Sequence, residues 1–261
     1  MTPNPHSYFH YHACAHAFSG RFTRPFDEQI HVQAMSSLPL TGGHGSARVE
    51  NFKFHEFISF KAGYTHVSGG LQPDDESNNT LVTSALEGLN LLDVLTADRV
   101  VCRLYSKHPK RAAEGNITMH GSKFENLRIC GHPVTMNLDF GLFEGIPTFE
   151  RAQAEYAKKK DFWKTAKDPL QAGKDLPSQK DTGEFLCSLV KGQVQVESPG
   201  VQVSGHSIYV PGFGRVYFAE VFMSYGTRTL TMLRFEFGST TGGSGSGASG
   251  TTNGKQYPPS G

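Results

Sequence analysis

A pattern of eight residues that occurs three times constrains the fold of this chain more than any other feature. Each copy has a small residue first, an apolar residue third, glutamate fourth, Asn or Gly fifth, and apolar residues sixth and eighth. The glutamates are 37 and 38 residues apart. A period of that length suits two strands and a loop, so we expect two-strand repeats of about 38 residues and roughly six strands from three units. The copies are ARVENFKF from Ala47, SALEGLNL from Ser84 and SKFENLRI from Ser122.

The residue after each glutamate indicates which way the glutamate points. In an uninterrupted strand Glu50 would share a face with Phe52 and Phe54, and the carboxylates of all three copies would enter the core. Asn and Gly accept the left-handed backbone of a β-bulge, in which one extra residue reverses the alternation of side chains. The residues at this place are Asn51, Gly88 and Asn126.

With such a bulge in each copy, the three glutamates face outward, because burial of an unpaired charge is costly. The residues that then face the core are Val49, Leu86 and Phe124. A cation site assembled from the three carboxylates is one alternative. Glutamates at the rim with no special role are another.

The composition favours the same fold class. The chain has 29 Gly, 19 Phe and a single Trp, which suits turns and apolar strand faces better than a helical bundle. We predict a mainly β protein, an antiparallel β-sandwich or barrel, with one inserted amphipathic helix over about 148–167. Thr148 is the expected N-cap of that helix and Pro169 follows its end.

The domain prediction follows from where these patterns stop. Residues 1–238 form one β-rich domain, in which 142–183 is the helical insertion. Residues 239–261 are rich in Gly, Ser and Thr and have too few apolar side chains to build a core, so we predict a disordered tail.

Charge and hydropathy exclude several classes of function. With 25 basic and 24 acidic residues the net charge is +1, so we expect no nucleic-acid partner. No stretch reaches the roughly 18 apolar residues of a membrane-spanning helix. The first residues show no secretory signal, which predicts a cytoplasmic protein, or one at the cell surface if the N-terminus is incomplete. The repeated hairpins leave strand edges through which copies of the chain can pair.

The N-terminal stretch FHYHACAHAF is the strongest candidate for chemistry. His10, His12, Cys14 and His16 alternate with apolar residues, which predicts a strand with Phe9, Tyr11 and the alanines facing inward. Neighbouring same-face positions are about 7 Å apart, so His10 and His12 can share a divalent transition metal but four positions cannot. A distant group such as His31 would have to complete that site. A strand whose outer face is simply polar is the alternative.

No catalytic residue is predicted. The sequence has no Gly-x-Ser-x-Gly elbow, phosphate-binding loop or His-Glu-x-x-His motif, and the pairs His44 with Ser46 and His206 with Ser207 are common neighbours in any chain. We therefore expect a non-enzymatic structural or interaction module with no cofactor. The alternative is a cupin-like metal-binding protein or metal-dependent enzyme that uses His10 and His12.

Four blocks of the sequence resemble the bacterial choice-of-anchor P proteins. They occur in the same order as in that family and cover a Leu-rich strand pair, a Gly-x-Pro-Val turn, a Pro-Gly-x-Gly strand and a closing apolar strand. The resemblance implies a β-rich, surface-associated bacterial protein without established catalysis, and it supplies no site residues. The blocks are TLVTSALEGLNLLDVLTADRVVCRL (80–104), FENLRICGHPVTMNLD (124–139), VPGFGRVYFAEV (210–221) and RTLTMLRFEFG (228–238).

Overall fold

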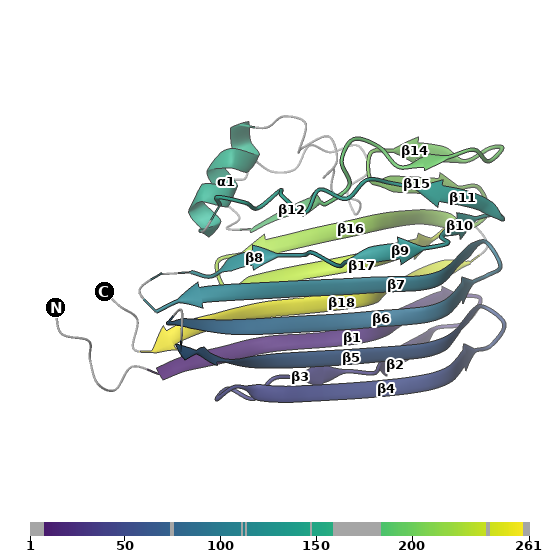
Figure 1. The fold of residues 1–261 in the computed structure, drawn as a ribbon. Coiled ribbons are helices and arrows are strands. Elements are labelled where there is room, and N and C mark those ends of the chain that lie inside the picture. The colour runs from purple at the N-terminus through teal and green to yellow at the C-terminus, as the bar shows by residue number, and fades with distance from the viewer. Residues whose placement is uncertain are drawn as a thin grey trace.

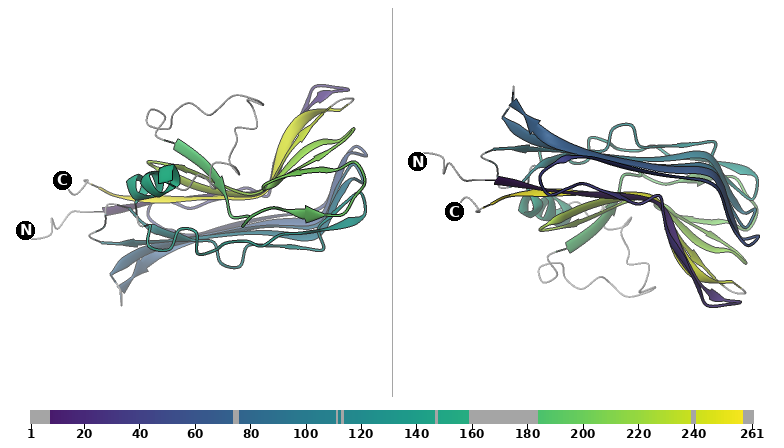
Figure 2. Two further views of the ribbon diagram at one scale, coloured as in Figure 1. Left: turned by 90° about the horizontal axis from the view of Figure 1, so that it is seen from above. Right: turned by 90° about the horizontal axis from the view of Figure 1, so that it is seen from below.

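The computed structural model describes residues 8–73, 76–110, 112, 114–146, 148–158, 184–238 and 241–257. These residues form two antiparallel sheets that pack face to face as two layers (Figures 1 and 2). The mainly β fold class is confirmed, with the sandwich as its architecture. No helix within the described ranges is long and apolar enough to cross a membrane.

The first layer, sheet A, combines the two ends of the chain with the strands after the helix. Two short strands also belong to this sheet: β12 (Glu184–Ser188) pairs with β16, and β3 (Ser36–Ser37) pairs with β1. The order across the sheet is β14 (Gln202–Ser204), β15 (Ser207–Val210), β16 (Gly214–Ser224), β17 (Thr227–Phe237), β18 (Gly242–Tyr257), β1 (Tyr8–Arg24) and β2 (Glu28–Gln33).

The second layer, sheet B, contains the repeated pattern. Its four long strands follow one another as a meander, and the short strands β8 (Asn116–Thr118) and β9 (Lys123–Glu125) both pair with β7. The order across the sheet is β13 (Gln195–Val196), β11 (His132–Thr135), β10 (Arg128–Ile129), β7 (Leu95–Pro109), β6 (Ser77–Leu91), β5 (Ile58–Gln72) and β4 (Gly43–Phe54).

The first two copies of the repeat occupy β4 and β6, and the third lies over β9 and β10. The residue after each glutamate has the predicted left-handed backbone, with φ of 53° at Asn51, 63° at Gly88 and 49° at Asn126. The side-chain alternation reverses there, so Val49 and Leu86 pack on the core and Glu50 points outward. The prediction that a β-bulge inserts an extra residue at these positions was wrong, however. Pairing continues in the same register on both sides of Asn51 and Gly88.

The segment after Gly238, predicted to be a disordered tail, instead forms β18 in the middle of sheet A. It pairs with β1 along nearly its whole length, from Tyr8 opposite Tyr257 to Arg24 opposite Gly242, and with β17 on its other side. The prediction was wrong because it treated this composition as unable to pack. The domain therefore extends beyond residue 238.

The glycines of β18 are the reason that this strand fits between apolar neighbours. Glycines such as Gly245, Gly247 and Gly250 lie on its inner face together with the buried Thr252, while Ser244, Ser246, Ser249 and Thr251 lie on its outer face. A Cβ atom on Gly245 would lie 2.4 Å from the Phe235 ring, and one on Gly250 would lie 2.6 Å from Cγ1 of Val82 in sheet B. Apolar side chains from other strands therefore pack directly on the backbone of β18, which itself contributes only the small side chain of Ala248 to the core among its described residues.

The helix α1 (Phe149–Lys158) confirms the first part of the helix predicted over about 148–167, and residues 159–167 lie outside the described residues. Thr148 is its N-cap, since its hydroxyl accepts a hydrogen bond from the Arg151 amide at 3.2 Å. Phe149 stacks on Phe185 of β12 with ring centroids 5.6 Å apart. The helix is thereby attached to sheet A.

Candidate functional site

The N-terminal histidines lie on the outer face of β1. Tyr11, Ala13 and Ala15 are buried against the core, as predicted, while His10 and His12 are exposed. His16 is half-buried further along the strand, where Nε2 lies 3.2 Å from the Ser246 hydroxyl, and burial lowers its pKa. The structure thus agrees with a strand whose outer face is polar.

The geometry around His10 and His12 limits what they can bind. His31, the distant group considered as a third ligand, lies on β2, where Ile30 pairs with Gly20. Gly20 is eight residues beyond His12 on β1, which corresponds to about 27 Å along a strand. Among the described residues, no group of three or more His, Cys, Asp or Glu side chains is placed to hold a metal ion. Within the described part of the chain, His10 and His12 therefore form a two-residue site.

A buried network of charges on sheet A, which no sequence motif indicated, has Glu220 at its centre. The Glu220 side chain is 4% exposed and accepts two hydrogen bonds from Arg234, at 2.5 and 2.8 Å. Its Oε1 also lies 3.1 Å from Nε2 of His206. The Arg234 guanidinium stacks on the Tyr217 ring at 3.6 Å from its centroid and bonds to Glu236.

The electrostatics of this network favour an ionised Glu220. Burial alone would raise the pKa of its carboxyl group, but the bonds from Arg234 and His206 outweigh burial and leave that pKa below its ordinary value. Burial, with the nearby Glu236 carboxylate, raises the pKa of Tyr217. His206 and its neighbour Ser207 have different partners, because the Ser207 hydroxyl donates to Ser204 and accepts from Arg215. The network is thus an ion-pair cluster and no serine nucleophile is activated by His206.

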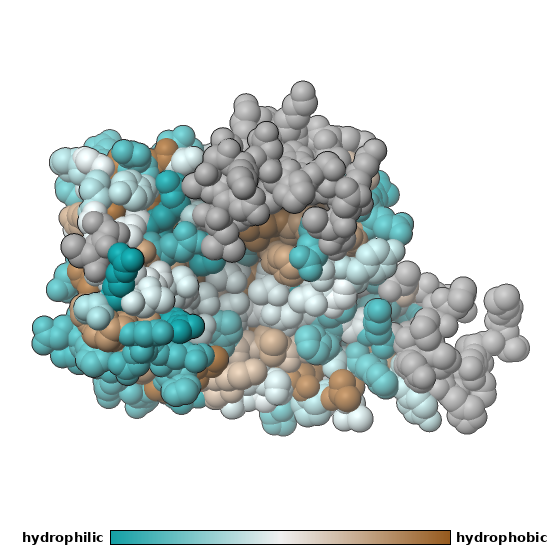
Figure 3. Space-filling view, turned by 180° about the vertical axis from the view of Figure 1, so that it is seen from behind, coloured by the Kyte–Doolittle hydropathy of each residue, from teal (hydrophilic) through white to brown (hydrophobic). Residues whose placement is uncertain are grey.

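The rest of the outer face of sheet A carries rows of hydroxyl groups. Thr229 and Thr251 are 2.9 Å apart across β17 and β18, and Thr231 and Ser249 are 3.1 Å apart. Figure 3 looks onto this face, where pale and teal residues cover much of the visible surface, with brown residues next to the grey atoms and along the lower edge. These hydroxyls hydrogen-bond to one another, so the rows hold neighbouring strands together.

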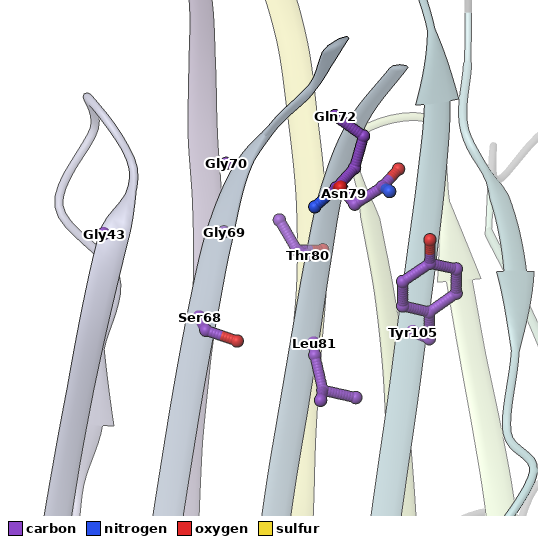
Figure 4. A pocket seen from close by; sticks show the side chains of 9 residues that line it. All are labelled: Gly43, Ser68, Gly69, Gly70, Gln72, Asn79, Thr80, Leu81 and Tyr105. Carbon is purple, nitrogen blue, oxygen red and sulfur yellow. The ribbon is translucent and has the colours of Figure 1, made fainter. Parts of the chain in front are cut away.

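A hollow of about 500 Å³ lies on the outer face of sheet B, near the end of the sandwich that holds both chain termini (Figures 1 and 4). Its volume is within the range of ligand-binding pockets. It extends across four strands, from Gly43 on β4 to Tyr105 on β7. Gly70, which has no side chain, leaves a gap in this lining. The side chains around it belong to Ser68, Gln72, Asn79, Leu81 and Tyr105.

Strand register places these side chains in two rows. Ser68, Leu81 and Tyr105 are paired in sequence across β5, β6 and β7, and Gly70 is paired with Asn79 in the next row. A Cβ atom added to Gly70 would meet nothing within 4 Å, so the missing side chain of Gly70 leaves open space. Figure 4 shows the Tyr105 ring nearly face-on beside Leu81, with the ends of Gln72 and Asn79 close together.

The described side chains that line the hollow are polar or apolar but uncharged. The lining combines hydroxyl and amide groups with one aromatic ring and one leucine, and none of the lining residues within the described part of the chain is acidic or basic. Ser77 donates a hydrogen bond to Oδ1 of Asn79 at 2.9 Å, which orients that amide. The hollow is therefore suited to a neutral polar ligand.

Comparisons with known proteins place the chain in a family but do not give it a function. No curated protein and no solved structure matches the chain. One family model matches it over residues 9–179 and 162–224, which is more than half of the sequence. The chain therefore belongs to the family described as a domain of unknown function (DUF8256).

Proposed function

We propose that this protein is a non-enzymatic interaction module and that the hollow on the outer face of sheet B is its binding surface. The observation that carries the proposal is the convergence of Gln72, Asn79 and Tyr105 around the open space left by Gly70. Long paired strands hold these residues, so the surface exists before a ligand arrives, and a preformed site binds at a lower entropic cost.

Amide chemical shifts measured by NMR test this proposal for ligands of several chemical classes at once. The protein is titrated with separate pools of neutral sugars, anionic metabolites, amino acids and aromatic compounds. We expect at least one pool to shift the amides of Gly70, Asn79 and Tyr105 and to leave those of Thr229 and Thr251, on the other sheet, unchanged. If no pool shifts the amides of the hollow, the proposal is wrong.

A second candidate function, binding of a divalent transition metal, uses His10 and His12. It is supported by their position two residues apart on the exposed face of one strand. Calorimetry with zinc or copper would detect one bound ion per chain, and the double variant His10→Ala/His12→Ala would remove it. The matched control is His44→Ala/His66→Ala, a pair of exposed histidines on the outer face of sheet B. Equal binding by wild type and the His10/His12 variant would exclude this site.

Self-association is a third proposal, through the outer edge of β4, the last strand in the order of sheet B. A strand at the edge of a sheet presents backbone N–H and C=O groups to a second copy, although the charged residues Arg48, Glu50 and Lys53 on β4 would limit how closely two such edges pair. Light scattering over a range of protein concentrations decides between a monomer and an assembly. A mass that stays at one chain throughout would refute pairing through β4.

A further inference from the structure

We infer that the hollow on sheet B binds a neutral oligosaccharide, with the Tyr105 ring stacking against one sugar. This inference rests on the proposed function, because it names the ligand class of the same surface. Three properties of the lining support it, namely its chemistry, its orientation and its extent.

The side chains that the structure describes in the lining favour an uncharged ligand. A phosphate, a carboxylate or an ammonium group placed in the hollow would meet mainly hydroxyls, amides and backbone, since none of the described lining residues carries a charge to pair with it. An apolar ligand would find few contacts, because Leu81 and Tyr105 are the only large apolar side chains among the lining residues that the structure describes. A sugar has both kinds of surface that remain, a ring of hydroxyls at its edge and C–H groups on its face.

The polar groups match hydroxyls in donors and acceptors. An amide offers both a carbonyl oxygen and an NH₂ group, and a hydroxyl can donate and accept, so Ser68, Gln72 and Asn79 can meet sugar hydroxyls in either role. The bond from Ser77 occupies Oδ1 of Asn79, and this leaves the NH₂ group of Asn79 as the available donor. The site therefore has at least one donor whose direction is fixed in advance.

The apolar groups form a flat platform beside these amides. Leu81 and Tyr105 are directly paired on β6 and β7, and Figure 4 shows the ring nearly face-on from outside the sheet. A ring in this orientation presents its electron-rich face, which attracts the positively polarised C–H groups of a sugar. The platform and the amides are in adjacent rows of the sheet, so one sugar can contact both.

The extent of the hollow favours a chain of sugars. Four strands separated by the usual spacing span about 14 Å, which is longer than a single pyranose ring. The absence of a side chain at Gly70 leaves the middle of this span open. An oligosaccharide lying across β4, β5, β6 and β7 therefore reaches from Gly43 to Tyr105.

Calorimetry and amide chemical shifts with defined oligosaccharides test the inference. The neutral probes are cellohexaose, laminarihexaose, maltohexaose, xylohexaose, mannohexaose and chitohexaose, and hexagalacturonic acid is the anionic probe. We expect at least one neutral probe to bind and to shift the amides of Gly70, Asn79 and Tyr105. The anionic probe should not bind.

Variants of the full chain identify the site. Tyr105→Ala should weaken binding about tenfold or more, as removal of a central aromatic contact commonly does. Gly70→Leu fills open space without a clash at Cβ and should abolish binding while the protein folds normally. The matched control is Tyr64→Ala, which removes a tyrosine from the same sheet where Arg48 and Arg99 flank its ring. It should bind as tightly as wild type.

The outcomes separate this inference from the proposed function. If no neutral probe binds but another class of compound shifts the amides of the hollow, the assignment of an oligosaccharide ligand is wrong, and the proposal that the hollow is a binding surface is still supported. If nothing shifts these amides, both are wrong. Binding that survives in Gly70→Leu, or that shifts only amides of sheet A, also overturns the inference.

Discussion

Ala219 on β16 and Ala248 on β18 lie at the same level of sheet A, on either side of β17, and both have a left-handed backbone with φ of 51° and 50°. Asn51 and Gly88 have the same relationship in sheet B, on either side of β5. In both sheets the pairing register is unchanged across the row. Alternate strands therefore reverse their side-chain alternation together, and Figure 2 shows that both layers bend.

The first prediction concerns this row in sheet B. Asn51→Val places a β-branched residue at a positive φ and should lower the free energy of unfolding by about 1 to 2 kcal/mol. Asn51→Gly should change it by less than about 0.5 kcal/mol, because glycine accepts this conformation. Urea unfolding followed by circular dichroism measures both.

Lys61→Val is the matched control for Asn51→Val. Lys61 lies opposite Asn51 on β5 and does not have a positive φ. A valine is favoured in a strand, so this variant should be as stable as wild type within about 0.5 kcal/mol. Equal losses in Asn51→Val and Lys61→Val would mean that the left-handed backbone is not the cause.

Part of the fold could be predicted from single residue types. The residue after each glutamate predicted a left-handed backbone and outward carboxylates, because Asn and Gly are the types that accept that conformation. Strand β1 was predicted from its alternation. β18 was not, because a glycine face packs only when neighbouring strands supply the apolar side chains, and its own sequence cannot show those neighbours.

The second prediction tests the packing of β18. Gly250→Val would place Cβ 2.6 Å from Cγ1 of Val82, and overpacking of this kind should cost about 1 to 3 kcal/mol of unfolding free energy. Ser244→Val is the control, since Ser244 is on the exposed outer face of the same strand and should change stability by no more than about 0.5 kcal/mol. If residues 239–261 were a disordered tail, both variants would be as stable as wild type.

The candidate sites depend on register, which explains why the sequence did not reveal them. Ser68, Leu81 and Tyr105 form one row although 37 residues separate the first from the last. Glu220 and Arg234 meet in the same way across β16 and β17. The alternation of Arg234 and Glu236 with Leu233, Phe235 and Phe237 was a usable signal for two charges on one outer face. Nothing in the sequence identified Glu220 as the buried partner of Arg234.

The third prediction concerns the four cysteines, which are all free thiols in the structure. Cys102 and Cys187 are fully buried and burial raises the pKa of both thiols, whereas Cys130 is exposed. A thiol reagent should therefore modify Cys130 first, and Cys102 and Cys187 only after denaturation. Cys130→Ser should remove the fast phase. A fast phase that persists in this variant would place a second reactive thiol at the surface.

The fourth prediction concerns the pH dependence of stability that Glu220 confers. Because the folded state lowers the pKa of this carboxyl group, its ionised form stabilises the protein above the unfolded value of about 4.3. That contribution is lost as the pH falls below the unfolded value and through the lower, folded one. Chemical unfolding measured from neutral pH down to the lowest pH at which the fold persists should show this decline.

Glu220→Gln should remove this part of the decline and, at neutral pH, destabilise the protein by about 3 kcal/mol, because Arg234 would lose the buried one of its two ionic partners and keep only Glu236. Glu50→Gln is the matched control. Glu50 also pairs with an arginine, Arg48, but its side chain is 58% exposed, so water screens the pair and the loss should stay below about 0.5 kcal/mol. Equal losses in the two variants, or an unchanged pH profile in Glu220→Gln, would show that the buried ion pair does not stabilise sheet A.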